Sequence, residues 1–167
     1  MGELFDYNEQ LPKKIAAFLI KTNRSLALAE SCSGGLISHR ITQVPGSSRF
    51  FLGAVVAYSN HLKSTLINVN EKSLKKFGAV SEQVAIEMAE GIKNISGSDF
   101  ACAVTGIAGP GGGSSEKPLG LVYIAFMSKK ENNCFKFNFT GSREDIKLKT
   151  SNEALNIIFD GIKSYGN

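Results

Sequence analysis

The stretch FACAVTGIAGPGGG, residues 100–113, contains the two features that decide the fold. Residues 100–104 form a short apolar run, which is typical of a strand buried on both faces of a sheet. Residues 105–113 form a glycine-rich loop directly after it. In open α/β sheets, ligands bind beyond the carboxyl ends of the strands. The sequence therefore predicts functional residues in this loop and in the loops that follow neighbouring strands.

Further strands and helices are predicted on both sides of this stretch. The apolar runs 25–29, 53–57 and 121–126 predict buried strands, and the alternating segment 135–139 predicts an edge strand. Predicted helices cover residues 8–22, a short segment from Asn60, the segment that follows the N-cap candidate Ser81 to residue 95, and a segment from Ser142 to about residue 163. This alternation predicts an α/β protein, a three-layer α/β/α sandwich with a mostly parallel or mixed central sheet.

Length and composition restrict the class of protein. A chain of 167 residues with 43% hydrophobic and 20% charged residues predicts one globular domain, residues 1–167. The longest apolar run, 119–127, is too short to span a bilayer, and residues 1–6 have no features of a secretory signal, so a cytoplasmic location is expected. The net charge of +4 is scattered along the chain, which favours a small anionic substrate over nucleic acid or membrane.

Few residues of the types that bind metals are present. The cysteines, Cys32, Cys102 and Cys134, are widely spaced, and the histidines are His39 and His61. None of these residues has the spacing of a zinc or redox motif. We therefore expect no structural metal.

The residues after the first predicted strand are Ser31, Cys32, Ser33, Gly34 and Gly35. They open a helix, where backbone N–H groups can point at an anion or a developing oxyanion. An ordinary helix cap explains the same composition. Cys32 is either a nucleophile beside a helix start or a small buried hydrophobic residue, and burial habits favour the second interpretation.

Lys63 follows the second predicted strand, a few residues after Tyr58. Most lysines at such positions are solvated. A lysine buried in a cleft would have a lowered pKa, and its neutral amine would accept a proton from a serine. Strand-end geometry favours Ser31 as the nucleophile. Ser48 is a competitor, but it precedes the second strand, so it reaches Lys63 only if its loop folds back or a second subunit supplies it.

Arg143 begins the last predicted helix, where it either binds a phosphate together with the helix N-terminus or forms a surface ion pair with Asp145 or a neighbouring residue. The loop of residues 105–113 is the third candidate segment, and it contains Thr105, Gly106 and Gly109. It has neither the ending of a P-loop nor the spacing of a dinucleotide-binding fingerprint.

These same loops resemble a known family. The matching segments, in order, are AESCSGGL at 29–36, VPGSS at 44–48, VAYSN at 56–60, GAVS at 78–81 and VTGIAGP at 104–110 followed by GGS at 112–114 and KP at 117–118. The chain resembles the C-terminal domain of the competence-damage-inducible protein CinA, of which stand-alone members act as nicotinamide-nucleotide amidases. One departure is Ser33, where the family usually has threonine.

The resemblance implies hydrolysis of nicotinamide mononucleotide (NMN) to nicotinic acid mononucleotide and ammonia, without metal or organic cofactor. It also implies a homodimer. Carried to matching positions, it marks a pocket of Ser31, Ser48, Tyr58, Lys63, Thr105 and Arg143. A second hypothesis is a non-catalytic nucleotide-binding or partner-binding module linked to competence or DNA damage, because the same glycine loops would serve it.

Overall fold

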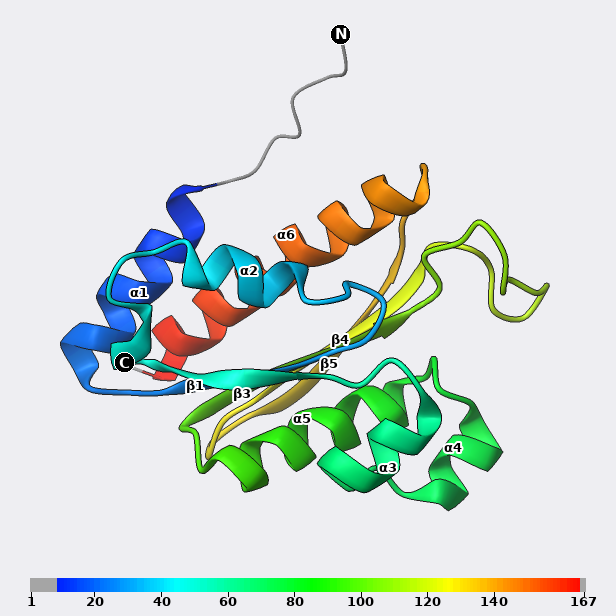
Figure 1. Cartoon of the computed structure of the whole chain (residues 1–167), viewed down its shortest axis with the longest axis horizontal. Helices are drawn as coiled ribbons and strands as arrows, with labels where there is room; N and C mark the ends of the chain where they lie inside the picture. Colours follow the sequence, from blue (N-terminus) through cyan, green and yellow to red (C-terminus); the bar gives the residue numbers. More distant parts are fainter. Residues whose placement is uncertain (1–8, 166–167) are drawn as a thin grey trace, which may run out of the picture.

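The computed structural model describes residues 9–165, and they are built around one five-stranded sheet in the order β2-β1-β3-β4-β5 (Figure 1). The strands are β1 Leu26–Glu30, β2 Phe51–Val56, β3 Phe100–Gly106, β4 Leu121–Met127 and β5 Asn132–Asn138. β1 is parallel to both β2 and β3, whereas β4 is antiparallel to β3 and β5. The predicted mixed sheet is therefore confirmed.

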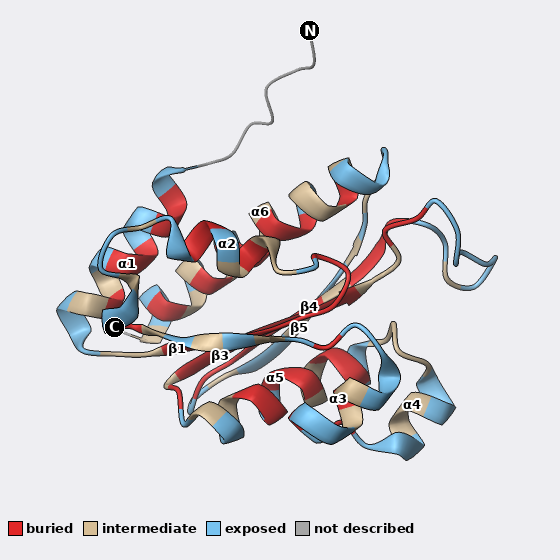
Figure 2. Cartoon of the chain, in the orientation of Figure 1, coloured by how far each residue is buried: buried red, intermediate tan, exposed pale blue. Residues whose placement is uncertain are grey.

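Helices cover both faces of this sheet, as the predicted sandwich requires. The helices are α1 Gln10–Thr22, α2 Leu36–Thr42, the 3₁₀ helix η1 Ser47–Arg49, α3 Asn60–Ile67, α4 Glu71–Phe77, α5 Glu82–Ser96 and α6 Arg143–Tyr165. Helices α1, α2 and α6 lie on one face, and α3, α4 and α5 lie on the other (Figure 1). Figure 2 shows that the buried residues concentrate in β1, β3, β4 and the helix sides that face them.

The alternation of side chains along the central strands divides the core in two. Leu26 and Leu28 of β1 point into the cluster that includes α1 and α6, while Ala27 and Ala29 point into the cluster that includes α5. The α5 side is lined by small alanine side chains, so the helix lies close to the sheet. Gly91 lets α5 approach its neighbour α3 closely, because a Cβ there would lie 1.8 Å from the carbonyl oxygen of Ile67 at the end of α3.

Side-chain caps open several of the helices, and the predicted cap at Ser81 is confirmed. Ser81 caps α5 by accepting a hydrogen bond from the amide of Val84, and Ser59 caps α3 in the same way through Leu62. At the start of α6, Ser142 and Asp145 exchange hydrogen bonds in a variant of the capping box, where the sequence predicts the last helix to begin. These caps fix where the helices start, and so they fix the loops before them.

Two details of the sequence prediction are wrong. The run at 53–57 is not buried on both faces, because β2 is an edge strand whose residues alternate between half-buried and exposed. Helix α4 was not predicted at all. Of the helix predicted at 8–22, residue 8 lies outside the described residues, and the described helix begins at Gln10.

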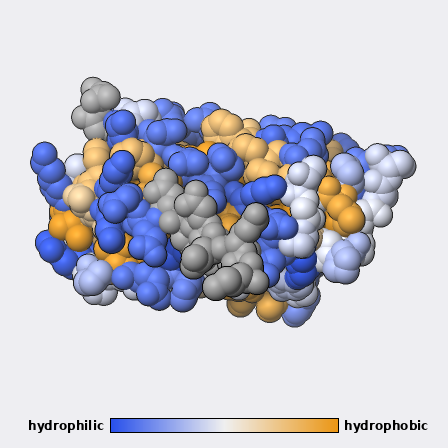
Figure 3. Space-filling view, turned by 90° about the horizontal axis from the view of Figure 1, so that it is seen from above, coloured by the Kyte–Doolittle hydropathy of each residue, from blue (hydrophilic) through white to orange (hydrophobic). Residues whose placement is uncertain are grey.

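The surface over α1, α2 and α6 is mostly hydrophilic, with separate hydrophobic patches (Figure 3). Among residues 9–165, no helix combines the length and the hydropathy needed to cross a bilayer. For function, the main consequence of the fold is geometric. The carboxyl ends of the parallel strands β1, β2 and β3 lie along the same side of the sheet. There the polar loops that follow the strands meet α3 and the start of α6 (Figure 1).

Candidate functional site

A buried lysine and a serine meet at this edge of the sheet. Lys63 lies on α3, just after β2, and its side chain is only 1% exposed. Its Nζ donates hydrogen bonds to the Oγ of Ser31 at 3.0 Å and to the carbonyl oxygen of Ala57 at 2.7 Å. The sequence prediction that strand-end geometry brings Ser31 and Lys63 together is thus what the structure shows.

Burial controls the protonation of this lysine. Desolvation lowers the pKa of Lys63, and the neighbouring Cys32 opposes that shift only in part. No carboxylate in the described chain forms an ion pair with the amine, whose two hydrogen bonds go to neutral oxygens. A neutral amine keeps one N–H for Ala57 and turns its lone pair toward Ser31. The arrangement suits a base that takes a proton from a hydroxyl.

Ser31 lies in the turn between β1 and α2, and it is 8% exposed. The turn is closed by a hydrogen bond from the amide of Gly34 to the carbonyl of Ser31 at 3.1 Å. Gly34 and Gly35 have φ values of +63° and +94°, which residues with a Cβ rarely adopt. The glycines of this turn are therefore explained by its backbone shape, and that shape directs the Ser31 hydroxyl at Lys63.

A buried carboxylate holds this turn, and sequence reasoning assigned it no role. Glu30 is fully buried. Its two oxygens accept hydrogen bonds from the amides of Gly35, Ile37 and Ser38 and from the hydroxyls of Ser33 and Ser38. Because these donors open α2, the helix dipole also favours the negative charge. Its only sequence signal was its position between a buried strand and a serine-glycine turn.

Glu30 changes the expectation about an oxyanion site. The amide of Gly35 and the hydroxyl of Ser33 are bound to Glu30, and the amide of Gly34 is bound within the turn. The amides of Cys32 and Ser33 are different, because no oxygen of residues 9–165 accepts a hydrogen bond from them. Both amides lie next to Ser31 and are directed at the sulfur of Cys32.

Cys32 is a buried side chain and a poor nucleophile in this state. Burial raises the pKa of its thiol to about 12, although the amides of Cys32 and Ser33 lower it slightly. The thiol is thus protonated at neutral pH, and only the thiolate is a strong nucleophile. The interpretation as a small buried hydrophobic residue is the one that the structure supports.

Tyr58, Gly109 and Arg143 form the outer rim. The guanidinium of Arg143 donates to the Tyr58 hydroxyl at 2.6 Å and to the Gly109 carbonyl at 2.6 Å. Tyr58 is 57% exposed, so the rim faces solvent. Asp145 does not pair with Arg143, because its carboxylate accepts hydrogen bonds from Ser142. The surface ion pair considered from the sequence is therefore wrong, and the guanidinium faces the rim.

Thr105 and Gly106 end β3 beneath the glycine loop. The Thr105 hydroxyl donates to the carbonyl of Ala79 at 2.8 Å, and its side chain is 1% exposed. A Cβ on Gly106 would lie 2.6 Å from a Val122 methyl and 3.0 Å from the Cys32 sulfur. Both residues therefore hold loops together, and no hydrogen bond joins Thr105 to Lys63 within the described chain.

Ser48 lies away from this site in the single chain. It belongs to the exposed helix η1 before β2, whereas Lys63 follows the other end of that strand. The six residues of β2 span about 20 Å at roughly 3.3 Å each, and the loop does not fold back. A role for Ser48 therefore remains a prediction that needs a second subunit.

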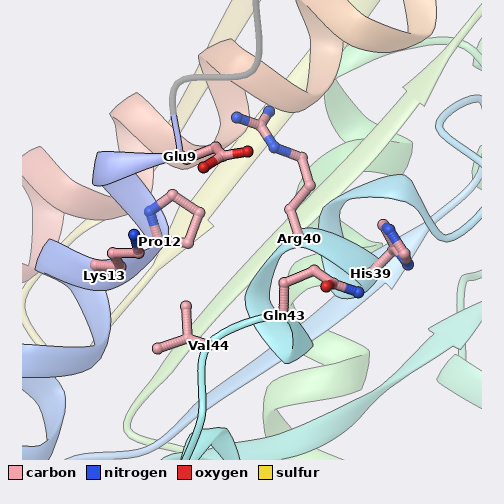
Figure 4. Close-up of a pocket in the computed structure, with 7 residues that line it drawn as sticks. All are labelled: Glu9, Pro12, Lys13, His39, Arg40, Gln43 and Val44. Atoms are coloured by element: carbon pink, nitrogen blue, oxygen red, sulfur yellow. The ribbon is translucent and has the colours of Figure 1, made fainter.

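A cavity elsewhere contains none of the predicted site residues. It has a volume of about 460 Å³ and lies between α1 and α2, where Figure 4 shows Lys13, His39 and Arg40 among its lining. His39 is therefore a lining residue of a helix groove. In the described part of the chain, no three histidine, cysteine or acidic side chains gather in a way that could hold a metal ion.

Comparison with known proteins agrees with these features. The model of the CinA C-terminal domain matches residues 8–162. A CinA-like protein of Endomicrobium trichonymphae is 48% identical over 151 residues, which cover 90% of this chain and 35% of that protein. This chain thus spans little more than a third of that relative.

Solved structures give the same result. The competence/damage inducible protein CihA from Agrobacterium tumefaciens is 38% identical with a TM-score of 0.91, over 95% of this chain and 98% of that chain. A CinA superfamily protein from Klebsiella pneumoniae is 28% identical with a TM-score of 0.90, over 95% and 99%. The chain belongs to the CinA C-terminal domain family.

Proposed function

We propose that this protein is an amidohydrolase that converts NMN to nicotinic acid mononucleotide and ammonia. The observation that carries the proposal is the buried Lys63, whose Nζ lies 3.0 Å from the Ser31 hydroxyl and whose pKa is lowered by burial. A neutral amine beside a hydroxyl is a known variant of nucleophilic catalysis. The substrate itself is taken from the resemblance of the motifs, and the rim with Arg143 is compatible with its phosphate.

In the proposed first step, Lys63 accepts the proton of the Ser31 hydroxyl while the oxygen attacks the carboxamide carbon. The carbonyl oxygen becomes an oxyanion, which the amides of Cys32 and Ser33 would stabilise in place of the Cys32 sulfur that they now face. The C–N bond then breaks, and the nitrogen takes the proton from Lys63 and leaves as ammonia. An ester between Ser31 and the nicotinoyl group remains.

The second step repeats the first with water in place of Ser31. Lys63 removes a proton from the water, the hydroxide attacks the ester carbon, and the proton returns to the Ser31 oxygen as the acid leaves. Tyr58 stands at the rim, where it would stack on the pyridine ring or relay a proton, and Arg143 would bind the phosphate.

Ammonia release from NMN by the purified protein tests the proposal, and serine variants separate the nucleophiles. We expect Ser31→Ala to lower kcat by about 10³-fold or more, as loss of a nucleophile does in other serine hydrolases. Ser48→Ala should leave the rate of a single-chain site unchanged. A large loss in Ser48→Ala with activity retained in Ser31→Ala would instead assign the nucleophile to Ser48 of a second subunit in a homodimer.

The non-catalytic alternative makes the opposite prediction for the same assay. A nucleotide-binding or partner-binding module would bind NMN and release no ammonia. The name of the similar Agrobacterium protein refers to competence and damage and states no reaction. Binding of NMN to the wild-type protein without turnover would therefore replace the amidase proposal with this alternative.

A further inference from the structure

Two cations project from the first turns of α6 toward the candidate site. Arg143 and Lys147 are four residues apart, so they lie on the same side of the helix. Arg143 reaches Tyr58 and Gly109, as described above. Lys147 reaches the other side of the site, because a Cβ built on Gly34 would lie 3.6 Å from its Nζ. Its ammonium thus lies beside the turn that carries Ser31.

Lys147 has no hydrogen-bond or ion-pair partner among the described residues. Its side chain is half-buried, yet within residues 9–165 its Nζ forms no hydrogen bond and no ion pair. The nearby acid Asp145 is bound by Ser142. Lys149, two residues further along and so on the other side of the helix, donates to the carbonyl of Thr140 instead. A half-buried charge without a partner is unfavourable. A bound anion would supply the missing partner of the Lys147 ammonium.

The single positive charge of Arg143 does not neutralise the charge of a phosphate monoester. Such a phosphate carries a charge of about −1.5 to −2 at neutral pH. The guanidinium of Arg143 already uses two of its five N–H donors on Tyr58 and Gly109, and it brings one positive charge. A second cation within one helical turn would supply the remaining charge. Lys147 is the cation at that position.

We propose that Lys147 is a second phosphate-binding residue, which together with Arg143 holds the 5′-phosphate of the substrate along the first two turns of α6. The proposal rests on the proposed function for the identity of the nucleotide. It gives the substrate a direction. The phosphate lies between the Ser31 turn and the Tyr58 rim, and the carboxamide points inward to Ser31 and Lys63. It also makes a 5′-phosphate a requirement for tight binding.

Steady-state kinetics of Lys147→Gln test this role. We expect KM for NMN to rise about tenfold with kcat within twofold, because the variant loses one charge-assisted hydrogen bond to the phosphate and none to the reacting carboxamide. KM for nicotinamide riboside, which lacks the phosphate, should not change. Lys149→Gln is the matched control, since it removes the same charge from the same helix and should leave both values unchanged. Lys147→Arg should retain tight binding.

Equal losses on both substrates, or an unchanged KM for NMN in Lys147→Gln, would overturn the proposal. A second readout covers failure of the proposed function itself. Inorganic phosphate at constant ionic strength should raise the Tm of the wild-type protein and of Lys149→Gln, but it should raise that of Lys147→Gln clearly less. If the wild type releases no ammonia but this difference appears, the amidase fails and the anion site stands. If the Tm of all three proteins responds equally, the anion site fails.

Discussion

The turn that follows β1 and the loop that follows β3 differ in what lies beneath their glycines. Both are rich in glycine, and both lie at the same edge of the sheet. The β1 turn is built on the buried Glu30 and touches the buried Lys63. The β3 loop is exposed over residues 110–116, and the nearby Lys117 donates to the carbonyls of Phe77 and Val80.

The comparison shows which property of a loop indicates chemistry. Glycine content is similar in the two segments and reports only backbone shape. The buried titratable side chains, Glu30 and Lys63, are the real difference, because each needs hydrogen-bond partners to be tolerated away from water. In the β1 turn these partners include the hydroxyl of Ser31, whereas in the β3 loop the lysine is bound to backbone carbonyls alone.

The largest expected effect comes from exchanging the two lysines for methionine. Lys63→Met removes the proposed base and should lower kcat for ammonia release by about 10³-fold or more. Lys117→Met removes two hydrogen bonds to backbone carbonyls and should change kcat less than about threefold. Circular dichroism should first show that both variants are folded. Similar losses of kcat in the two variants would then contradict the proposed difference between the two loops.

A smaller effect is expected from the carboxylate under the β1 turn. Glu30→Gln replaces one accepting oxygen with an NH₂ group, which is a donor and cannot accept the hydrogen bonds that this oxygen now receives. We expect kcat to fall about 10- to 100-fold with KM nearly unchanged, and stability to fall by about 2 kcal/mol, because buried donors lose their acceptor.

Glu87→Gln is a matched control for that prediction. Glu87 also accepts three hydrogen bonds, from Asn70, Ser73 and Gln83, but it lies on α5 and is half-buried. It should lose some stability and retain kcat. A kcat in Glu30→Gln equal to that of the wild type would show that the carboxylate does not position Ser31.

The pH dependence of stability gives a third, smaller effect. The pKa of Lys63 is lower in the folded than in the unfolded chain, so between these two values the unfolded chain binds more protons. Stability contributed by this site should therefore rise with pH across that window and level off below the folded pKa. Urea unfolding from about pH 6 to about pH 10 should show this rise in the wild type and a flatter curve in Lys63→Met.

The smallest effect concerns the end of β3. Thr105→Val removes the hydrogen bond to the carbonyl of Ala79 and should cost about 1 kcal/mol of stability. Because this hydroxyl holds a loop, kcat should change little, in contrast to Ser31→Ala. A loss of kcat as large as that of Ser31→Ala, at unchanged stability, would move Thr105 into the reacting group.

The sequence allowed prediction wherever the signal was local. The cap at Ser81 and the helix after Asn60 follow from neighbouring residues, and both are present. The meeting of Ser31 and Lys63 also followed, because the carboxyl ends of parallel strands share an edge. The edge position of β2 did not follow, since an apolar run is compatible with either position in a sheet.

The contacts that were missed join residues whose proximity exists only after folding. The carboxylate of Glu30 finds its five donors only when the turn has brought the start of α2 back over β1. Lys147 is an ordinary helix lysine in the sequence, and its approach to Gly34 depends on how α6 lies on the sheet. Thr105 binds a carbonyl 26 residues away. No periodicity or spacing encodes such pairs.

The central claim is that Lys63 is an uncharged amine next to Ser31 in the folded protein. Titration of the lysine side chains by NMR, with Lys63→Met to assign the signal, measures this directly. The account predicts that Lys63 titrates below all solvent-exposed lysines, at the pH where kcat/KM for NMN reaches half of its plateau on the acidic side. A Lys63 signal that titrates together with the exposed lysines would contradict it.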